Sequence, residues 1–390
     1  MKYQRVFYAL ITMILVLTLG LSVGAEQEAS FLVSLGLSEA EAAKIEAQCK
    51  VNGYIDELVK EIDETKHGGF LIDEKNTLHV YLVPNTNETK TMRRIQRDPD
   101  VVFHECTYSF RDLQDIQDTV LEQYGEEWNV VRSYIDVQTN RVVIEMPVSK
   151  MDNGRRTRSG VRPDQPLTIV PVGDSDTFDV KLNASTSAVE IYPSNQYTNR
   201  STWSSATIGF FARERSGSKR YGFVTAGHAV GVGNVVEMWG ESIGTCVKST
   251  TDKVDCAFVA LNSGVEGYSM IDYGSGLGTK QISGYTRDNY VKGKMYICAG
   301  GESGIVSGEC ENVSVVVGGF FKNRQALFSF KLQEGDSGSP ILYASSPGGR
   351  TLILNGMSSM GEASTSKGLG YTMDELEDTL GVDWVQTVIL

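Results

Sequence analysis

The chain has 390 residues, more than one ordinary domain accommodates, so two folded units are expected. Its formal net charge is −13, of which residues 191–390 carry −3 and the remainder −10. Neither half has a basic patch that could follow a phosphate backbone, so nucleic acid is not an expected partner. The acidity of the N-terminal half is interpreted as solvated surface.

Residues 1–25 have the pattern of a secretory signal peptide. Lys2 and Arg5 precede an apolar run from Val6 to about Leu21, and small residues occupy positions 23 and 25. This pattern predicts cleavage after Ala25 and a secreted, extracellular protein. The alternative is a membrane anchor, but the run is short for a spanning helix, and no later segment approaches the ~20 apolar residues needed. No stable membrane anchor is therefore expected.

Residues 26–150 are expected to form an α+β domain. Ser38 precedes an acidic first turn and apolar residues at helical spacing, which predicts a helix capped by this serine. Two strand-turn-strand patterns follow at residues 69–83 and 130–146, each with an Asp/Asn-rich centre between β-branched flanks. Residues 151–204 are polar, with four arginines followed by prolines, and are interpreted as a linker and processing region.

Residues 205–390 carry many short alternating strands separated by Gly-rich turns, with almost no helix before Thr372. This pattern predicts an all-β closed architecture with a terminal helix at about residues 373–380.

One constellation of residues in this half points to chemistry. Ser337 lies in the segment Gly-Asp-Ser-Gly-Ser-Pro, and a serine hydroxyl needs a base within hydrogen-bond reach to become a nucleophile. His228, in Thr-Ala-Gly-His, is the only histidine after position 104. Asp255 lies in a short apolar strand, where a carboxylate is costly unless it is paired, for example with an imidazole N–H. The order Ser…Asp…His of the α/β-hydrolases is excluded because no histidine follows Ser337.

These motifs resemble the chymotrypsin-like serine proteases, in particular the bacterial secreted branch with α-lytic protease and the streptogrisins. The resemblance begins near Ala206 and reaches the C-terminus. It implies two antiparallel six-stranded β-barrels, with His228 and Asp255 on the first and Ser337 on the second. It also implies that residues 26–150 are a propeptide that acts as an intramolecular folding aid and inhibitor. The enzyme is then expected to be a monomer without a cofactor or metal, acting on protein or peptide substrates.

The resemblance also implies roles for residues around the nucleophile. The N–H groups of Gly335 and Ser337 are expected to form the oxyanion hole. Asp336 is interpreted as a structural carboxylate that holds the loop. The candidate substrate-binding residues are Lys331 and the segment of Met357, Ser358, Ser359 and Met360. Because long thioethers fill space, the two methionines predict a narrowed apolar primary pocket, unless the Lys331 ammonium reaches the pocket and selects Glu or Asp instead.

Export makes disulfides available, and six cysteines are candidates. Cys298 and Cys310 bracket a Gly/Ser-rich hairpin similar to the disulfide-closed loop of the bacterial proteases. Cys246 and Cys256 lie on neighbouring predicted strands, which leaves Cys49 and Cys106 for each other. This branch usually has a disulfide between a cysteine before the strand at residues 207–210 and a cysteine just after the catalytic histidine; the corresponding positions here are Ala206 and Ala229.

Two classes of function stay open on the sequence. The first is a secreted serine endopeptidase made as a zymogen. The second is a catalytically silent, protease-like binding or adhesion module. Silent relatives usually lose a residue of the triad, and all three residues are present here, so the sequence favours the enzyme.

Overall fold

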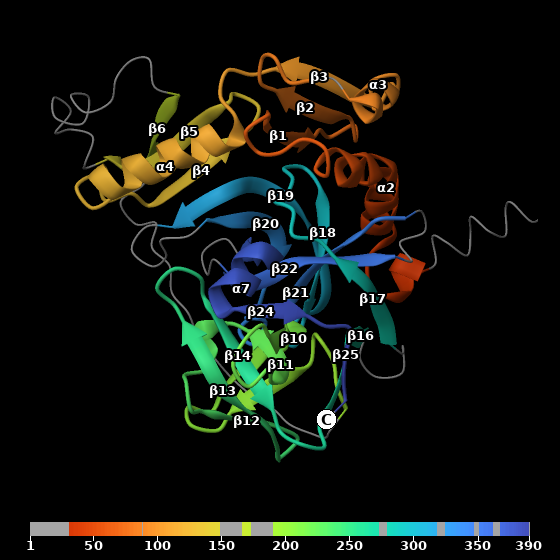
Figure 1. Ribbon diagram of the computed structural model, residues 1–390, viewed down its shortest axis with the longest axis vertical. Coiled ribbons are helices and arrows are strands. Elements are labelled where there is room, and N and C mark those ends of the chain that lie inside the picture. Colours follow the sequence, from red (N-terminus) through yellow and green to blue (C-terminus); the bar gives the residue numbers. More distant parts are fainter. Residues whose placement is uncertain are drawn as a thin grey trace, which may run out of the picture.

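The fold is that of a computed structural model, which describes residues 31–87, 89–148, 166–172, 190–272, 279–317, 324–346, 351–361 and 367–389. The predicted signal peptide and the arginine cluster of the linker lie outside these residues. The described chain is mostly β and has few helices, as predicted for its C-terminal half. In Figure 1 the N-terminal part (red to yellow) lies against the blue strands, and the green strands form the opposite end of the molecule.

The N-terminal part contains two groups of three strands covered by helices. The first is a separate sheet with the order β1-β2-β3, and the second, β4-β5-β6, is the end of a larger sheet. Buried residues of α2 pack with the first sheet, and buried residues of α4 pack with the second. The elements are α2 (Glu39–Leu58), β1 (His67–Ile72), β2 (Leu78–Leu82), α3 (Lys90–Ile95), β3 (Val101–Glu105), α4 (Phe110–Tyr124), β4 (Arg132–Asp136), β5 (Arg141–Pro147) and β6 (Leu167–Val172).

The predicted helix and both hairpins of this part are confirmed. Ser38 is the N-cap of α2 and forms a capping box with Glu41, in which each side chain bonds the other residue's backbone N–H. The hairpins are the antiparallel pairs β1–β2 and β4–β5. Helices α3 and α4 were not predicted from the sequence.

Seven strand segments form the first barrel, in the pairing order β10-β11-β14-β13-β12-β8-β9. Only two residues separate β9 from β10, so these two segments count as one interrupted strand, and the six strands return to their own start. The elements are β8 (Gln196–Asn199), β9 (Ser204–Thr207), β10 (Phe210–Glu214), β11 (Tyr221–Thr225), the 3₁₀ turn η1 (Gly227–Ala229), β12 (Val235–Met238), β13 (Glu241–Thr250) and β14 (Cys256–Leu261). Strand β8 begins before residue 205, where the sequence placed the start of this domain.

A second set of six strands also pairs in a closed cycle, in the order β18-β19-β20-β23-β22-β21 and back to β18; we call it the second ring. Its elements are β18 (Met295–Gly300), β19 (Gly304–Val317), β20 (Gln325–Lys331), β21 (Pro340–Ala344), β22 (Leu352–Gly361) and β23 (Lys367–Thr372). Helix α7 (Met373–Leu380) follows β23 directly and confirms the predicted terminal helix. Strand β24 (Val382–Trp384) then returns to pair with β10 of the first barrel.

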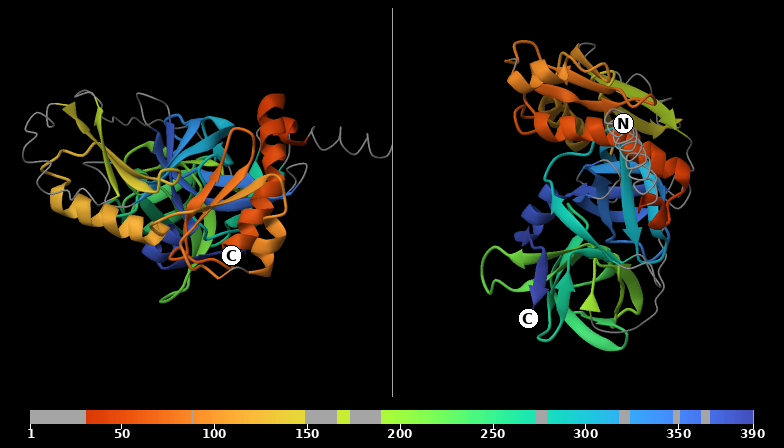
Figure 2. Two further views of the ribbon diagram at one scale, coloured as in Figure 1. Left: turned by 90° about the horizontal axis from the view of Figure 1, so that it is seen from above. Right: turned by 90° about the vertical axis from the view of Figure 1, so that its right-hand side faces the viewer.

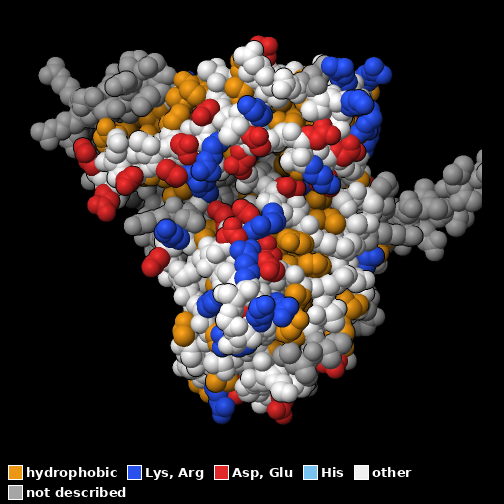
Figure 3. All heavy atoms as spheres, viewed as in Figure 1, with side chains coloured by type: hydrophobic (Ala, Val, Ile, Leu, Met, Phe, Trp, Pro, Cys, Tyr) orange, Lys and Arg blue, Asp and Glu red, His pale blue; other side chains and the backbone are white. Residues whose placement is uncertain are grey.

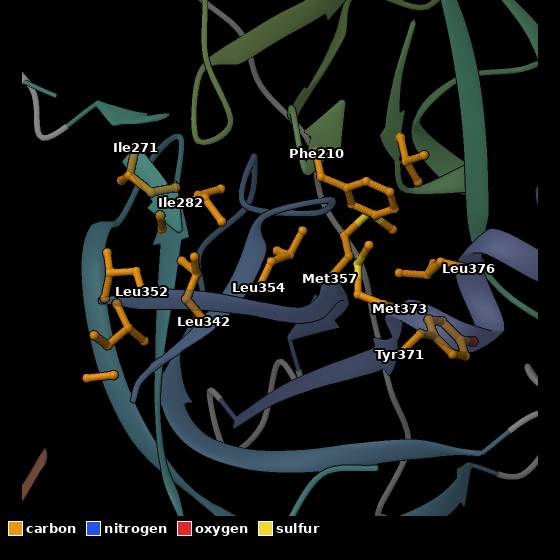
Figure 4. Close-up of a cluster of buried hydrophobic side chains, with 14 of the residues drawn as sticks. Phe210, Ile271, Ile282, Leu342, Leu352, Leu354, Met357, Tyr371, Met373 and Leu376 are labelled. Carbon is orange, nitrogen blue, oxygen red and sulfur yellow. The ribbon is translucent and has the colours of Figure 1, made fainter. Parts of the chain in front are cut away.

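The remaining strands lie beside these two units. Strands β16 (Met270–Asp272) and β17 (Thr279–Tyr285) form a pair, and β17 joins β22 of the second ring in parallel. Strand β15 (Glu266–Tyr268) pairs with β7 (Glu190–Ile191) and with β25 (Thr387–Ile389). A cluster of buried apolar side chains extends from Phe210 in the first barrel to Met357 in β22 and Leu376 in α7, as Figure 4 shows.

The N-terminal part is joined to the second ring by a continuous sheet. The last residues of β19 pair antiparallel with β4, with Val313 opposite Ile135 and Val317 opposite Arg132. Helix α2 lies on the other side of the same ring, as Figure 1 and the two views of Figure 2 show. Buried Gln48 of α2 donates to Gly293 O at 2.9 Å and accepts from Met295 N at 2.7 Å.

Candidate active site

The loop that carries Ser337 is a tight turn between β20 and β21. Gly335 and Gly338 have φ of +100° and +93°, a backbone conformation that side chains disfavour. A Cβ at Gly338 would also collide with Thr207 O. Ser339 N and its hydroxyl both bond Asp336 O, and Gly338 N donates to Ser358 O at 2.9 Å. The glycines therefore permit the backbone conformation that places Ser337 between the first barrel and the second ring.

The imidazole of His228 connects Asp255 to Ser337. His228 lies in the 3₁₀ turn after β11, and Asp255 immediately precedes β14, the strand that pairs with β11. The Nδ1 atom of His228 is 2.6 Å from Asp255 Oδ2, and its Nε2 atom is 3.1 Å from Ser337 Oγ. The backbone N–H of His228 also donates to Asp255 Oδ1 at 2.8 Å. Thus the three residues singled out in the sequence form one chain of hydrogen bonds.

The environment of His228 raises its pKa above the usual value of 6.5. Burial alone lowers this pKa, but the charge of Asp255 and the hydrogen bond to it outweigh the effect of burial. Asp255 is fully buried, and its two oxygens accept from the backbone and the ring of the same histidine. Such an arrangement holds the ring with its Nδ1–H toward the carboxylate and leaves Nε2 free to accept a proton.

The backbone N–H groups of Gly335 and Ser337 in the nucleophile loop have no acceptor among the described residues. The N–H groups of Asp336, Gly338 and Ser339 donate to Gln333 O, Ser358 O and Asp336 O, respectively. The described part of the chain supplies no acceptor for the N–H groups of Gly335 and Ser337, the pair that the sequence resemblance assigns to an oxyanion hole.

Asp336 is held by neutral donors that the sequence did not reveal. This buried carboxylate accepts from the N–H groups of Glu302 and Ser303 at 3.0 and 2.9 Å, and from Gln333 N at 2.6 Å. The Ser303 hydroxyl adds a further bond of 2.5 Å. Asp336 therefore ties the nucleophile loop to the β18–β19 turn, in agreement with the structural role predicted for it.

Thr207 is a second residue that sequence analysis missed. Its hydroxyl donates to Gly335 O at 2.7 Å and accepts from Gly301 N at 3.0 Å, while its backbone N–H donates to Ser337 O. Thr207 thus fixes both ends of the segment from Gly335 to Ser337. The only sequence signal was its place in the Ala-Thr-Ile-Gly-Phe segment that supports the resemblance.

The predicted substrate-binding residues do not all lie together. Met357 is fully buried in the apolar cluster of Figure 4, where it neighbours Phe210. Ser358 and Ser359 are also buried, and their hydroxyls donate to Asp336 O and Gln325 Oε1 at 3.0 Å each. Lys331 is exposed at the end of β20. The side chain of Met360 lies outside the described residues.

The candidate disulfides are not present: all six cysteines are buried, and none is bridged to another. The strand registers explain why the two hairpin pairs fail. Cys298 lies opposite Val306, four residues before Cys310 on β19, and Cys246 lies opposite Val259, whereas Cys256 lies opposite Thr250. Four residues of strand span about 13 Å, twice the Cα separation that a disulfide tolerates.

The third candidate pair, Cys49 and Cys106, is not bridged either, because its cysteines contact different parts of the molecule. Cys49 on α2 lies against the carbonyls of Ala344 and Ser346 in the second ring. Cys106 instead lies beside Tyr108 O, in the turn between β3 and α4.

The described residues contain no group of three or more His, Cys, Asp or Glu side chains arranged to hold a metal ion. Within the same ranges no helix is long and apolar enough to cross a membrane. In the view of Figure 3, acidic and basic side chains intermingle around α7, where Arg215 pairs with Asp378 and Asp383.

No family model matches the chain, and no curated protein matches it in sequence. Among solved structures, Thermobifida fusca protease A is 22% identical, with a TM-score of 0.41, over 50% of this chain and 99% of that one. Cellulomonas bogoriensis chymotrypsin is 21% identical, with the same TM-score and the same coverage. Nocardiopsis protease is 21% identical, again with a TM-score of 0.41, over 50% of this chain and 98% of that one. Two of the three are named as proteases and one as a chymotrypsin, and each match covers about half of this chain.

Proposed function

We propose that the protein is a secreted serine endopeptidase made as a zymogen. The observation that carries this proposal is the hydrogen-bonded chain from Asp255 through His228 to Ser337, next to two N–H groups without an acceptor among the described residues. A nucleophile, an oriented base and paired donors are the parts that acyl transfer requires.

In the proposed mechanism Ser337 Oγ attacks the peptide carbonyl while His228 Nε2 takes its proton. Asp255 keeps the imidazole in the correct tautomer and stabilises the imidazolium that forms. The N–H groups of Gly335 and Ser337 bind the negative oxygen of the tetrahedral intermediate, and each such donor typically contributes about 3 kcal/mol. His228 then protonates the leaving amine, and water releases the acyl group by the reverse sequence of proton transfers.

The N-terminal part is proposed to be the propeptide, removed by cleavage between residues 150 and 205. Its β4 strand and its helix α2 both pair with backbone groups of the second ring, which supports a role in folding that ring. The second ring is proposed to be the second barrel. With the propeptide, the two barrels make up the zymogen that the sequence resemblance implies. For the primary pocket, the buried position of Met357 leaves Met360 as the methionine on which the apolar prediction depends.

The test is active-site labelling of the purified secreted protein with a fluorophosphonate. We expect one label at Ser337 and hydrolysis of casein, with both lost in Ser337→Ala and at least a 10³-fold fall in hydrolysis for His228→Ala. Ser263→Ala, in an exposed turn, is the matched control. A folded wild-type protein that neither takes the label nor cleaves casein would instead identify the silent binding module.

A further inference from the structure

Next to the proposed oxyanion hole lies a patch of carboxylates that the proposed mechanism does not use. A Cβ placed on Gly335 would lie 3.5 Å from the Cβ of Glu302 and 2.5 Å from Gln196 Nε2. Gln196 donates to Glu302 Oε2 at 3.4 Å. Glu334 is the neighbour of Gly335 in the chain. Glu302 and Glu334 therefore both flank one of the two N–H groups that mark the position of the scissile carbonyl.

The patch lies on one side of the nucleophile only. Gly338 and Ser339, which follow Ser337, exchange backbone hydrogen bonds with Ser358 on β22. Gly335, which precedes Ser337, instead faces β8 of the first barrel and the β18–β19 turn, through Gln196 and Glu302. A substrate whose acyl side runs along β22 therefore directs its leaving-group side toward Glu302 and Glu334.

Neither carboxylate is neutralised within the described residues. Glu302 is exposed, Glu334 is half-buried, and neither takes part in an ion pair of the described chain. Lys331, three residues before Glu334, forms no ion pair among the described residues either and lies at the exposed end of β20. A peptide that brings a positive charge to this side thus meets uncompensated negative charge, and a peptide that brings a carboxylate is repelled.

From this geometry we propose that Glu302 and Glu334 form a leaving-group subsite that selects peptides with Lys or Arg at the first or second residue after the scissile bond. The Gln196–Glu302 hydrogen bond joins the first barrel to the second ring across this subsite and positions the Glu302 carboxylate. The inference depends on the proposed endopeptidase function, because it assigns the half of the substrate that departs as the amine. It is independent of the primary pocket, which binds the acyl half.

The experiment compares fluorescence-quenched peptides that share one acyl side and differ only in having Lys, Gln or Glu at the second leaving-group residue. The measured quantity is the ratio of kcat/KM for the Lys peptide to that for the Glu peptide within each variant. We expect a ratio on the order of ten in the wild type, because one exposed charge pair changes an equilibrium by up to about fivefold and two carboxylates act here. The ratio is expected to fall to about two in the double variant Glu302→Gln, Glu334→Gln, and to about one in Glu302→Lys, where the new ammonium offsets the charge of Glu334.

Two further measurements make the result decisive. Raising the salt to 1 M shortens the Debye length to about 3 Å and should bring the wild-type ratio close to that of the double variant. Glu241→Gln, at the exposed start of β13 in the first barrel, is the matched control and should keep the wild-type ratio. A wild-type ratio near one, or a ratio unchanged in the double variant, would overturn the subsite. Because fluorophosphonate labelling of Ser337 is scored separately, labelling without selectivity rejects only the subsite, and absence of labelling rejects the proposed function.

Discussion

The first barrel and the second ring contribute different parts of the candidate site and are stabilised in different ways. The first barrel closes on itself through β8–β14, with the buried Tyr197 and Phe223 in a cluster formed by residues from position 191 onward. The second ring shares its clusters and its sheet with the N-terminal part. Hence His228 and Asp255 lie on a unit whose sheet takes no strand from the N-terminal part, although its Phe210 shares a buried cluster with the second ring. Ser337 lies on a unit whose sheet is extended by β4 of the N-terminal part.

The residue that immediately precedes β18 shows how closely the N-terminal part packs against the second ring. Lys294 is buried, with its ammonium 3.2 Å from the centre of the Tyr343 ring. The Tyr343 hydroxyl donates to Asp56 of α2 at 2.9 Å. Burial lowers the pKa of Lys294 to about 8, although the charges of Asp56 and Asp288 act in the opposite direction. A charge in this position is tolerable only while the N-terminal carboxylate stays nearby.

The strongest test of this difference removes the N-terminal part. A chain without residues 26–150 should be inactive, because β19, β18 and Lys294 lose their partners. Hydrogen exchange should show protected amides in β11 and β14 and rapid exchange in β19 and β21. Addition of a separately produced fragment of residues 26–150 should restore activity. If the truncated chain folds by itself and its Ser337 reacts with the fluorophosphonate, the second ring does not need the N-terminal part in order to fold.

A second test concerns the first barrel alone, through the pH dependence of activity. His228 must be neutral at Nε2 to accept the serine proton, and its pKa is raised above 6.5 by Asp255. The rate kcat/KM should therefore rise with pH through a value above 6.5, and fall about tenfold for each unit below it. Asp255→Asn should remove this acid limb and lower kcat by about 10⁴. If the acid side of the wild-type kcat/KM profile had a pKa well below 6.5, it would contradict the pairing of His228 with Asp255.

A third test removes one contact between the N-terminal part and the second ring. Gln48→Ala leaves Gly293 O and Met295 N without partners, and each unpaired buried group costs about 1–3 kcal/mol. Urea unfolding should thus show a loss of about 2–4 kcal/mol if the N-terminal part and the second ring unfold together. Gln138→Ala, in an exposed turn of the same part, should change little. An effect below 0.5 kcal/mol for Gln48→Ala would mean that the contact adds nothing to stability.

The sequence predicted the elements whose signals are local. The capping serine of α2, the terminal helix at residues 373–380 and the order of His228, Asp255 and Ser337 were all visible in short motifs. It did not predict features that depend on how distant strands align. The sharing of β19 between two units and the donors around Asp336 follow from pairings across the fold, which no local pattern encodes.

The same limit explains the placement of Met357. Side chains alternate between the two faces of a strand, so a shift of one residue decides whether a methionine lines a pocket or the core. In β22 a register shift lies between Ser358 and Met360, close to the residues in question. The two methionines predicted an apolar lining of the primary pocket, but the sequence could not indicate which of them faces the pocket.

The smallest expected effect concerns the cysteines, and it separates the two units again. Burial raises the pKa of Cys246 in the first barrel to about 11, and raises that of Cys310 in the second ring further. Buried thiols with raised pKa values form little thiolate and react slowly. A reductant should therefore leave the melting temperature unchanged, and a thiol reagent should find no fast-reacting group in the native protein and six after unfolding. If the truncated chain is tested in the same way, Cys298 and Cys310 should become reactive before Cys246 and Cys256, because the second ring opens first.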